Sequence, residues 1–325
     1  MWPRVTALSF LIILMAAVVP ARGQVASGFP AKPVKFIIPF PGGGINDMLA
    51  RIAADKLTAK WGQPVVVENK TGAGGNIGAD FAAQAEPDGH TLFITPPGPL
   101  AINQSLYRQL SYRPEDFVPV TVLAAVNNLI IVRPEIGVNS VTELIAFAKH
   151  NPGKITYGSQ GNGSTPHLTG CMFMTLTGVR MIHIPYRGEN LVVNDMLGGH
   201  IDVFFGNIAP VLPHYRDGKL KVLAVADVKR AAPIPDVPTA AEAGLPGFIS
   251  TAWFAVAGPP KMPPALAQRL AADFADVLSM SDVQTKYRSV GAEPVGTTPV
   301  ETVAFVQAEA ARWREVITKN NIRIE

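Results

Sequence analysis

Residues 34–47 read Val34-Lys-Phe-Ile-Ile-Pro-Phe-Pro-Gly-Gly-Gly-Ile-Asn-Asp47. The β-branched run from Val34 to Pro39 predicts a strand, and the loop Pro41–Asp47 that follows it is rich in glycine. Apolar residues then recur at helical spacing from Leu49 to Leu57, and Gly62 is placed to end that helix. Strand, glycine loop and helix in this order are the building unit of an α/β fold.

The same unit recurs along the chain, which predicts α/β layering around a largely parallel sheet. In the first half, a helix after the loop Gly72–Gly75 is expected to end at Pro87-Asp-Gly89. In the second half, three strands lead into loops: Ile155–Tyr157 before Gly158–Pro166, Met181–Ile184 before Tyr186–Asn190, and Ile201–Phe205 before Gly206–Ile208. In an open α/β sheet the edge at the carboxyl ends of the strands binds ligands. The last part returns to helices, expected at 265–278, 283–290 and 300–317.

Composition excludes several classes of protein. The 325 residues suggest about two domains, and 48% hydrophobic with 16% charged residues excludes a disordered chain or a coiled coil. The single cysteine, Cys171, excludes an internal disulfide, and the six histidines lack the paired spacing of metal ligands. The glycine loops match neither a dinucleotide fingerprint nor a P-loop, and the net charge of +3 contains no basic run. We therefore expect no metal, no cofactor and no nucleic-acid partner.

The first 26 residues have the pattern of an export signal. Arg4 precedes an apolar stretch from Ala7 to Val19, which is too short to span a bilayer but fits the centre of a signal peptide. Its removal leaves 26 basic against 25 acidic side chains, so the mature chain is nearly neutral. We expect a periplasmic protein.

The loops at the expected helix starts have the composition of an anion site. Thr165 is expected to cap its helix with Pro166 as the first helical residue, which leaves Ser159, Gly163 and Ser164 to offer hydroxyls and amides to a carboxylate. The alternative is that these loops are merely tight turns. For one loop the two interpretations are balanced, but three such loops in the second half of the chain favour a ligand-binding site.

Charged residues near these loops have alternative roles. Asp47 is either the cap of a helix that starts at Met48, or it orders water or pairs with a cationic group on the ligand. Arg187 neutralises a carboxylate or is solvated. Glu189 would repel an anion unless it faces away, so it is interpreted as a specificity element rather than a contact.

The chain resembles the Bug-type, or TctC-like, substrate-binding proteins of tripartite tricarboxylate transporters. The motifs that carry the resemblance run in order through nearly the whole mature chain: Pro39-Phe-Pro41 with Gly43-Gly44 and Asp47, Gly62-Gln-Pro-Val-Val-Val-Glu-Asn-Lys70, Gly72-Ala-Gly-Gly75, Pro87-Asp-Gly89, Asp116-Phe-Val-Pro-Val120, Asn151-Pro-Gly-Lys154, His183-Ile-Pro-Tyr-Arg-Gly188, Asp195-Met-Leu-Gly-Gly199, and Pro235-Asp-Val-Pro-Thr239 with Glu242-Ala-Gly-Leu-Pro-Gly247. Each motif is weak alone, but their number and order are specific. Two positions depart from the family pattern, since Gly42 and Leu191 stand where the family often has proline.

The resemblance implies a two-lobed α/β periplasmic binding fold of the type II, Venus-flytrap kind, with the ligand cleft between the lobes. Lobe 1 would comprise residues 27–129 and 250–325, and lobe 2 residues 130–249. The ligand would be a small organic acid, held by backbone amides, hydroxyls and water, and delivered by a monomeric receptor to membrane permease subunits. Carried over position by position, the ligand-binding residues would be Phe40, Pro41, Gly43, Gly44, Asp47, Thr95, Ser159, Gly163, Ser164, Thr165, His167, Tyr186, Arg187 and Asn207.

Two other functions stay open at this point. An exported hydrolase or isomerase would use His183 or Asp47 as a base, although no catalytic motif supports it. Alternatively, a ligand-sensing receptor of the same fold would dock on a signalling protein instead of a permease.

Overall fold

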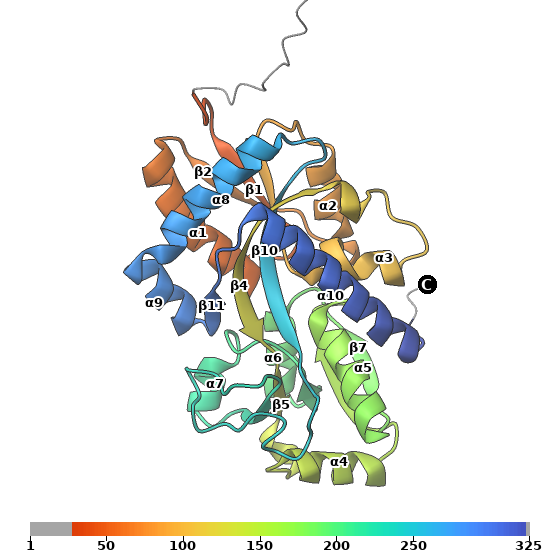
Figure 1. Ribbon diagram of the computed structural model, residues 1–325. Helices are drawn as coiled ribbons and strands as arrows, with labels where there is room; N and C mark the ends of the chain where they lie inside the picture. The colour runs from red at the N-terminus through yellow and green to blue at the C-terminus, as the bar shows by residue number, and fades with distance from the viewer. Residues whose placement is uncertain (1–27, 323–325) are drawn as a thin grey trace, which may run out of the picture.

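Two lobes, each built on its own β-sheet, make up the computed structural model, which describes residues 28–322 (Figure 1). The expected two-lobed α/β fold is therefore confirmed. The export signal expected at residues 1–26 lies outside the described residues. Between residues 28 and 322, no helix combines the length and the apolar character needed to cross a membrane.

Lobe 1 contains a six-stranded sheet in the order β11-β4-β10-β3-β1-β2. Its strands are β1 Val34–Ile38, β2 Val65–Asn69, β3 Thr91–Thr95, β4 Val118–Asn127, β10 Thr251–Gly258 and β11 Ala292–Pro294. Its helices are α1 Ile45–Trp61, α2 Asn76–Ala83, α3 Asn103–Leu106, α8 Pro264–Ser279, α9 Ser281–Ser289 and α10 Pro299–Lys319. The short helical turns η1 Ala73–Gly75, η2 Gly98–Ile102 and η3 Pro114–Asp116 complete it.

Lobe 2 contains a five-stranded sheet in the order β7-β6-β8-β5-β9. Its strands are β5 Leu129–Val132, β6 Thr156–Ser159, β7 Ile182–Pro185, β8 Val203–Phe204 and β9 Lys221–Val225. Its helical segments are η4 Pro134–Ile136, α4 Val141–His150, α5 Thr165–Thr177, α6 Glu189–Leu197 and α7 Leu212–Arg216.

Both sheets are mixed, so the expectation of largely parallel sheets is wrong. The strands of the predicted strand–loop–helix units are parallel, as in β1 with β2 and β3, and β6 with β7 and β8. In contrast, β10 pairs antiparallel with β3 and β4, and β5 pairs antiparallel with β8 and β9. In lobe 1 the reason is the path of the chain, which enters lobe 2 through β4 and returns through β10 (Figure 1). Because these two strands are neighbours and carry the chain in opposite directions, they pair antiparallel.

The two connections between the lobes are tied to each other. The Asn128 N–H, between β4 and β5, donates to the carbonyl of Ser250, which precedes β10, at 3.0 Å. The Asn128 side-chain amide also donates to the Ser250 hydroxyl at 2.8 Å and to Thr169 Oγ1 at 3.0 Å. All three side chains are buried, so the junction of the lobes is a defined polar cluster rather than a loose linker.

Each lobe has its own apolar core. In lobe 1, Phe36 of β1 stacks on Phe274 of α8 with ring centroids 5.8 Å apart, inside a cluster that also includes Leu49 of α1. In lobe 2, Phe173 of α5 packs against Phe205 with centroids 5.1 Å apart. A smaller apolar cluster joins the lobes, because Leu168 of α5 packs with Ile102 of η2 and Trp313 of α10.

Local signals predicted the helices with differing success. The three C-terminal helices lie within two residues of their expected bounds, whereas α2 ends at Ala83, well before the expected stop at Pro87. At α4, the Ser140 hydroxyl caps the helix by accepting from the Glu143 N–H, and the Glu143 carboxylate accepts from the Asn139 N–H. Strand β4 was not expected because Pro119 and two alanines interrupt its pattern.

Candidate ligand-binding site

A cleft of about 420 Å³ lies between the lobes. Lobe 1 contributes the loops after β1 and β2, and lobe 2 contributes the loops after β6 and β7. Its lining residues are Pro39, Phe40, Pro41, Thr71, Gly72, Ala73, Gly74, Gly75, Gln160, Gly161, Tyr186 and Arg187. Arg187 is the one charged residue in this lining, so the cleft offers a positive charge and many backbone groups but no carboxylate.

A second cavity of about 760 Å³ lies between α5, α10 and β10. Apolar side chains such as Leu176, Trp253 and Phe305 line much of it. Both cations in its lining are already paired, Arg312 with Glu309 at 2.7 Å and Lys319 with Glu315 at 2.6 Å, which leaves them little capacity for a ligand. An anion is therefore better accommodated in the cleft between the lobes.

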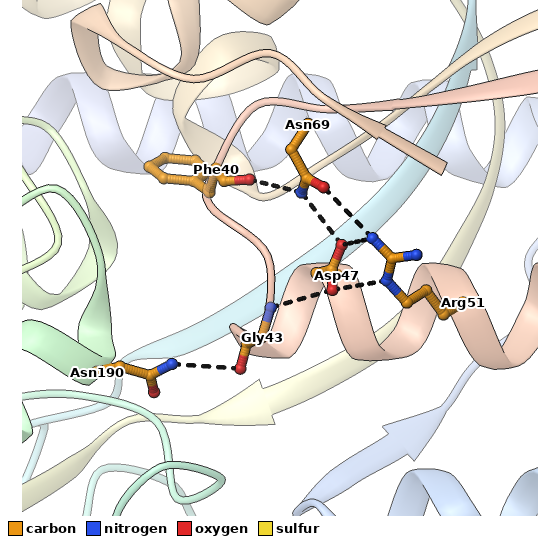
Figure 2. Close-up of polar contacts among 6 residues, drawn as sticks. All are labelled: Phe40, Gly43, Asp47, Arg51, Asn69 and Asn190. Carbon is orange, nitrogen blue, oxygen red and sulfur yellow. Dashed lines mark hydrogen bonds and ion pairs between the residues drawn. The ribbon is translucent and has the colours of Figure 1, made fainter. Parts of the chain in front are cut away.

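The lobe 1 wall depends on the carboxylate of Asp47 (Figure 2). Its Oδ2 accepts from the Gly43 N–H at 3.0 Å and from Arg51 Nε at 2.8 Å. Its Oδ1 accepts from Arg51 Nη2 at 3.0 Å and from Asn69 Nδ2 at 3.1 Å, and Asn69 Nδ2 also donates to the Phe40 carbonyl at 2.8 Å. One buried carboxylate thus fixes the loop from Phe40 to Gly43.

Asp47 is not the helix cap, which corrects the first expectation. The glycine triplet lets α1 begin at Ile45 with Gly44 as its cap, and this places Asp47 inside the first turn. Burial by itself would raise the pKa of Asp47, but the hydrogen bonds from Arg51, Gly43 and Asn69 and the Arg51 charge hold that pKa below its usual range. Because both oxygens are occupied by protein donors, Asp47 acts on the loop rather than on a cationic ligand group.

The lobe 2 wall is held by neutral groups. The Ser159 hydroxyl accepts from the Gly161 N–H at 3.1 Å and lies 2.7 Å from Nε2 of His183. The Ser164 hydroxyl donates to the Gly161 carbonyl at 2.6 Å. Both serines are buried, so they position the peptide groups around Gly161, which lines the cleft, instead of lining it themselves.

Two stacked histidines lie beneath this loop. The rings of His167 and His183 are 4.1 Å apart, and Nδ1 of His167 accepts from the Gly163 N–H at 3.1 Å. Burial lowers the pKa of His167 to about 4, and burial together with the neighbouring His167 lowers the pKa of His183 to about 3. Both rings are therefore neutral near pH 7 and act as hydrogen-bonding groups.

The start of α5 differs by one residue from the expectation. Ser164, not Thr165, is the cap, and Pro166 is the second helical residue. The Ser164 hydroxyl is engaged with Gly161 and makes no capping bond, while Thr165 Oγ1 is buried without a partner. The first amides of α5 are consequently not satisfied by a side chain.

The third loop joins β7 to α6. The Tyr186 hydroxyl donates to Asp195 at 2.6 Å, and Arg187 is exposed at the cleft. Glu189 is buried and accepts from the side-chain amide of Asn207. Across the cleft, Asn190 Nδ2 lies 3.5 Å from the Gly43 carbonyl, at the outer limit of a hydrogen bond (Figure 2).

Comparison with known proteins assigns the family. Residues 49–322 match the family model described as the tripartite tricarboxylate transporter family receptor, TctC. The chain belongs to this receptor family. The resemblance in the motifs is thereby confirmed.

Relatives of the receptor cover nearly its whole length. The protein BugT of Bordetella pertussis is 36% identical over 302 residues, which is 92% of this chain and 93% of BugT. The solved structure of R. palustris Rpa4515 with adipate is 37% identical, with a TM-score of 0.88, and covers 91% of this chain and 100% of that one. MatC from Rhodopseudomonas palustris with bound malate is 32% identical, with a TM-score of 0.84, and covers 89% and 100%.

In this receptor the residues expected to bind ligand fall into three groups. Phe40, Pro41, Tyr186 and Arg187 line the cleft. A second group does not line the cleft but lies in the lining loops or directly behind them: Gly43, Gly44, Asp47, Ser159, Gly163, Ser164, Thr165 and His167. Thr95 and Asn207 are fully buried and do not line it, since the Thr95 hydroxyl donates to the Pro96 carbonyl and Asn207 binds Glu189.

The sequence interpretation missed part of the cleft of this receptor. It did not name the loop Thr71–Gly75, nor Gln160 and Gly161, as lining. A signal for that loop existed, because Gly72-Ala-Gly-Gly75 follows a strand that runs parallel to β1, and parallel neighbours end at the same edge of a sheet. Asn69 carried no such signal.

Proposed function

We propose that this protein is an extracytoplasmic receptor that binds a small mono- or dicarboxylate in the cleft between its lobes. The observation that carries the proposal is the cleft lining, in which Arg187 is the sole charged side chain and glycine-rich loops supply backbone groups. An anion held by amides and one arginine needs no strongly basic protein.

Free helix amides support this proposal. Four helices begin beside the cleft without a side-chain cap: α1 after Gly44, α2 after Gly75, α5 after Ser164 and α6 after Gly188. Their first N–H groups and the positive ends of their dipoles favour a carboxylate.

The relatives point to the class of ligand. Rpa4515 was solved with adipate and MatC with malate, both of them dicarboxylates. We extend this chemistry to the present chain, with export to the periplasm and delivery to the permease subunits of a tripartite tricarboxylate transporter as the accompanying steps. The receptor would act as a monomer.

Closure would occur about the polar junction of the lobes. The hinges would be residues 127–129 and 249–251, where the chain crosses between lobe 1 and lobe 2. The contact of Asn190 with Gly43 across the cleft fits a closed arrangement.

The groups that an exported hydrolase would use are engaged elsewhere. His183 bonds Ser159, whose hydroxyl is fully buried, and Asp47 is paired with Arg51. A base and a nucleophile without access to the cleft favour binding over turnover.

Thermal stability in a panel of organic acids tests the proposal. A ligand at 100 times its Kd stabilises the folded state by about 2.7 kcal/mol, so a matching acid raises Tm. Arg187→Ala should reduce the shift, whereas Arg180→Ala should not, because Arg180 is exposed at the opposite end of β7. A panel of mono- and dicarboxylates that leaves Tm unchanged, including adipate and malate, contradicts the proposal.

A further inference from the structure

We propose that Glu189 takes up a proton when the cleft closes on its carboxylate ligand, so that the receptor binds an anion and a proton together. The inference rests on the proposed function of the cleft. It adds a titrating residue behind the wall of lobe 2.

Glu189 is an unusually isolated carboxyl group. It is the first residue of α6, the residue is 3% exposed, and no Lys, Arg or His among residues 28–322 forms an ion pair with it. Burial raises its pKa to about 7, although the hydrogen bond from Asn207 works in the opposite direction. A buried acid without a cation is stable in the fold mainly as the neutral form.

The geometry with Asn207 also fits a protonated acid. The Asn207 side-chain N–H donates to Oε1 of Glu189, while Oε2 of Glu189 and Oδ1 of Asn207 are both buried without a partner. If Oε2 of Glu189 carried a proton, it could donate a hydrogen bond to Oδ1 of Asn207, and both of these unpartnered oxygens would then be satisfied. The pair would then be satisfied by two reciprocal hydrogen bonds.

Residues on either side of Glu189 in the sequence lie at the cleft. Arg187, two residues before it, lines the cleft, and Asn190, directly after it, contacts Gly43 of lobe 1. A side chain added at Gly188 would come within 3.7 Å of Pro41 of lobe 1. A bound anion therefore lies close to Glu189 in a poorly hydrated region, and a nearby negative charge favours the neutral acid.

Other titratable groups on the surrounding elements are already engaged. On β6, the Tyr157 hydroxyl contacts Cys171, and β8 carries no titratable side chain. On α6 itself Asp195 accepts from Tyr186, and His183 of β7 bonds Ser159. In lobe 1, Asp47 and Arg51 are paired with each other, and Arg187 of lobe 2 lines the cleft, where it can meet the ligand.

The sign of the pH effect follows from proton uptake. If binding adds a proton, the affinity rises as the pH falls, by at most about tenfold per pH unit for one site. The affinity should stop rising at low pH, where Glu189 is already protonated before the ligand binds.

Calorimetry in two buffers of different ionisation enthalpy measures this proton directly. We would titrate the receptor with adipate, malate and the acid that gives the largest thermal shift, at a pH of about 7.5, where such acids are fully ionised. We expect an uptake between zero and one proton in the natural protein. Glu189→Gln should bind with no uptake, whereas Glu135→Gln, at a side chain that is 66% exposed, should keep it.

The outcomes separate the two proposals. Binding without proton uptake, or uptake that persists in Glu189→Gln, overturns the role of Glu189 and leaves the receptor function standing. Absence of binding by any acid overturns the receptor function and this inference with it. If Glu189→Gln does not fold, infrared difference spectra of the natural protein decide, because the C=O band of a protonated carboxyl must grow on ligand addition; an unchanged band overturns the inference.

Discussion

The two walls of the cleft hold similar glycine loops by different means. In lobe 1 a charged group does so, since the Asp47 carboxylate bonds Gly43, Arg51 and Asn69. In lobe 2 neutral groups do so, since Ser159 and Ser164 bond peptide groups of Gly161 and His167 bonds the Gly163 N–H, while His183 contacts the Ser159 hydroxyl. These bonds fix the shape of the loops from behind, and Arg187 is the one charged side chain in the cleft lining.

The difference implies that the two walls respond differently to acid. The lobe 1 wall keeps its negative charge until Asp47 is protonated. Because the pKa of Asp47 is lowered, this protonation requires a more acidic solution than for an ordinary aspartate. The lobe 2 wall is intact only while its buried histidines stay neutral. Lobe 2 should therefore be the first to lose stability as the pH falls.

Acid gives the largest expected effect. Burial lowers the pKa of His167 to about 4, whereas an unfolded histidine titrates near 6.5, so the unfolded state binds more protons between these values. Stability should fall as the pH drops through this window, by about 3 kcal/mol for His167, with His183 adding to it. Denaturant unfolding between pH 7 and pH 4 measures the loss.

His167→Asn sharpens this test. The asparagine keeps an acceptor for the Gly163 N–H but cannot ionise, so the acid loss should shrink by about 3 kcal/mol. An equal acid loss in the natural protein and this variant would show that the stacked histidines do not set the sensitivity of lobe 2.

Removal of the lobe 1 charge should come next in size. Asp47→Asn weakens charge-assisted bonds to Gly43 and Arg51, and we expect a loss of about 2 kcal/mol in the free energy of unfolding. Asp55→Asn, at an exposed position of the same helix, is the control and should change stability little. If both variants have the same free energy of unfolding, the charged network around Asp47 does not stabilise the lobe 1 wall.

The contact between the walls should have the smallest effect. Asn190→Ala removes the long bond to the Gly43 carbonyl, and we expect ligand affinity to fall by about threefold, with stability unchanged. Asn194→Ala, exposed one turn later in α6, should leave affinity unchanged in the same calorimetric titration. Equal affinities of the two variants would exclude Asn190 as a closing contact.

Much of the cleft could be predicted from local sequence. The loops at Pro41–Asp47 and Gly158–Pro166 were expected because a strand, glycines and a helix follow each other there, and both contribute to the walls. The role of Asp47 could not be predicted in this way, because one of its partners, Asn69, lies 22 residues away at the end of β2. Likewise, nothing near Glu189 in the sequence indicates that Asn207, 18 residues on, accompanies it into the interior.

The sequence by itself determined the strand–loop–helix units, the positions of the glycines and the motif series that marks the receptor family. These depend on backbone preference and short-range spacing, which are written locally in the chain. Only the tertiary structure decided which loops meet in the cleft, that both sheets are mixed, and that Glu189 is buried beside Asn207. Those features depend on strand order and on contacts between distant residues, and the energy of such contacts arises only when the sheets are assembled.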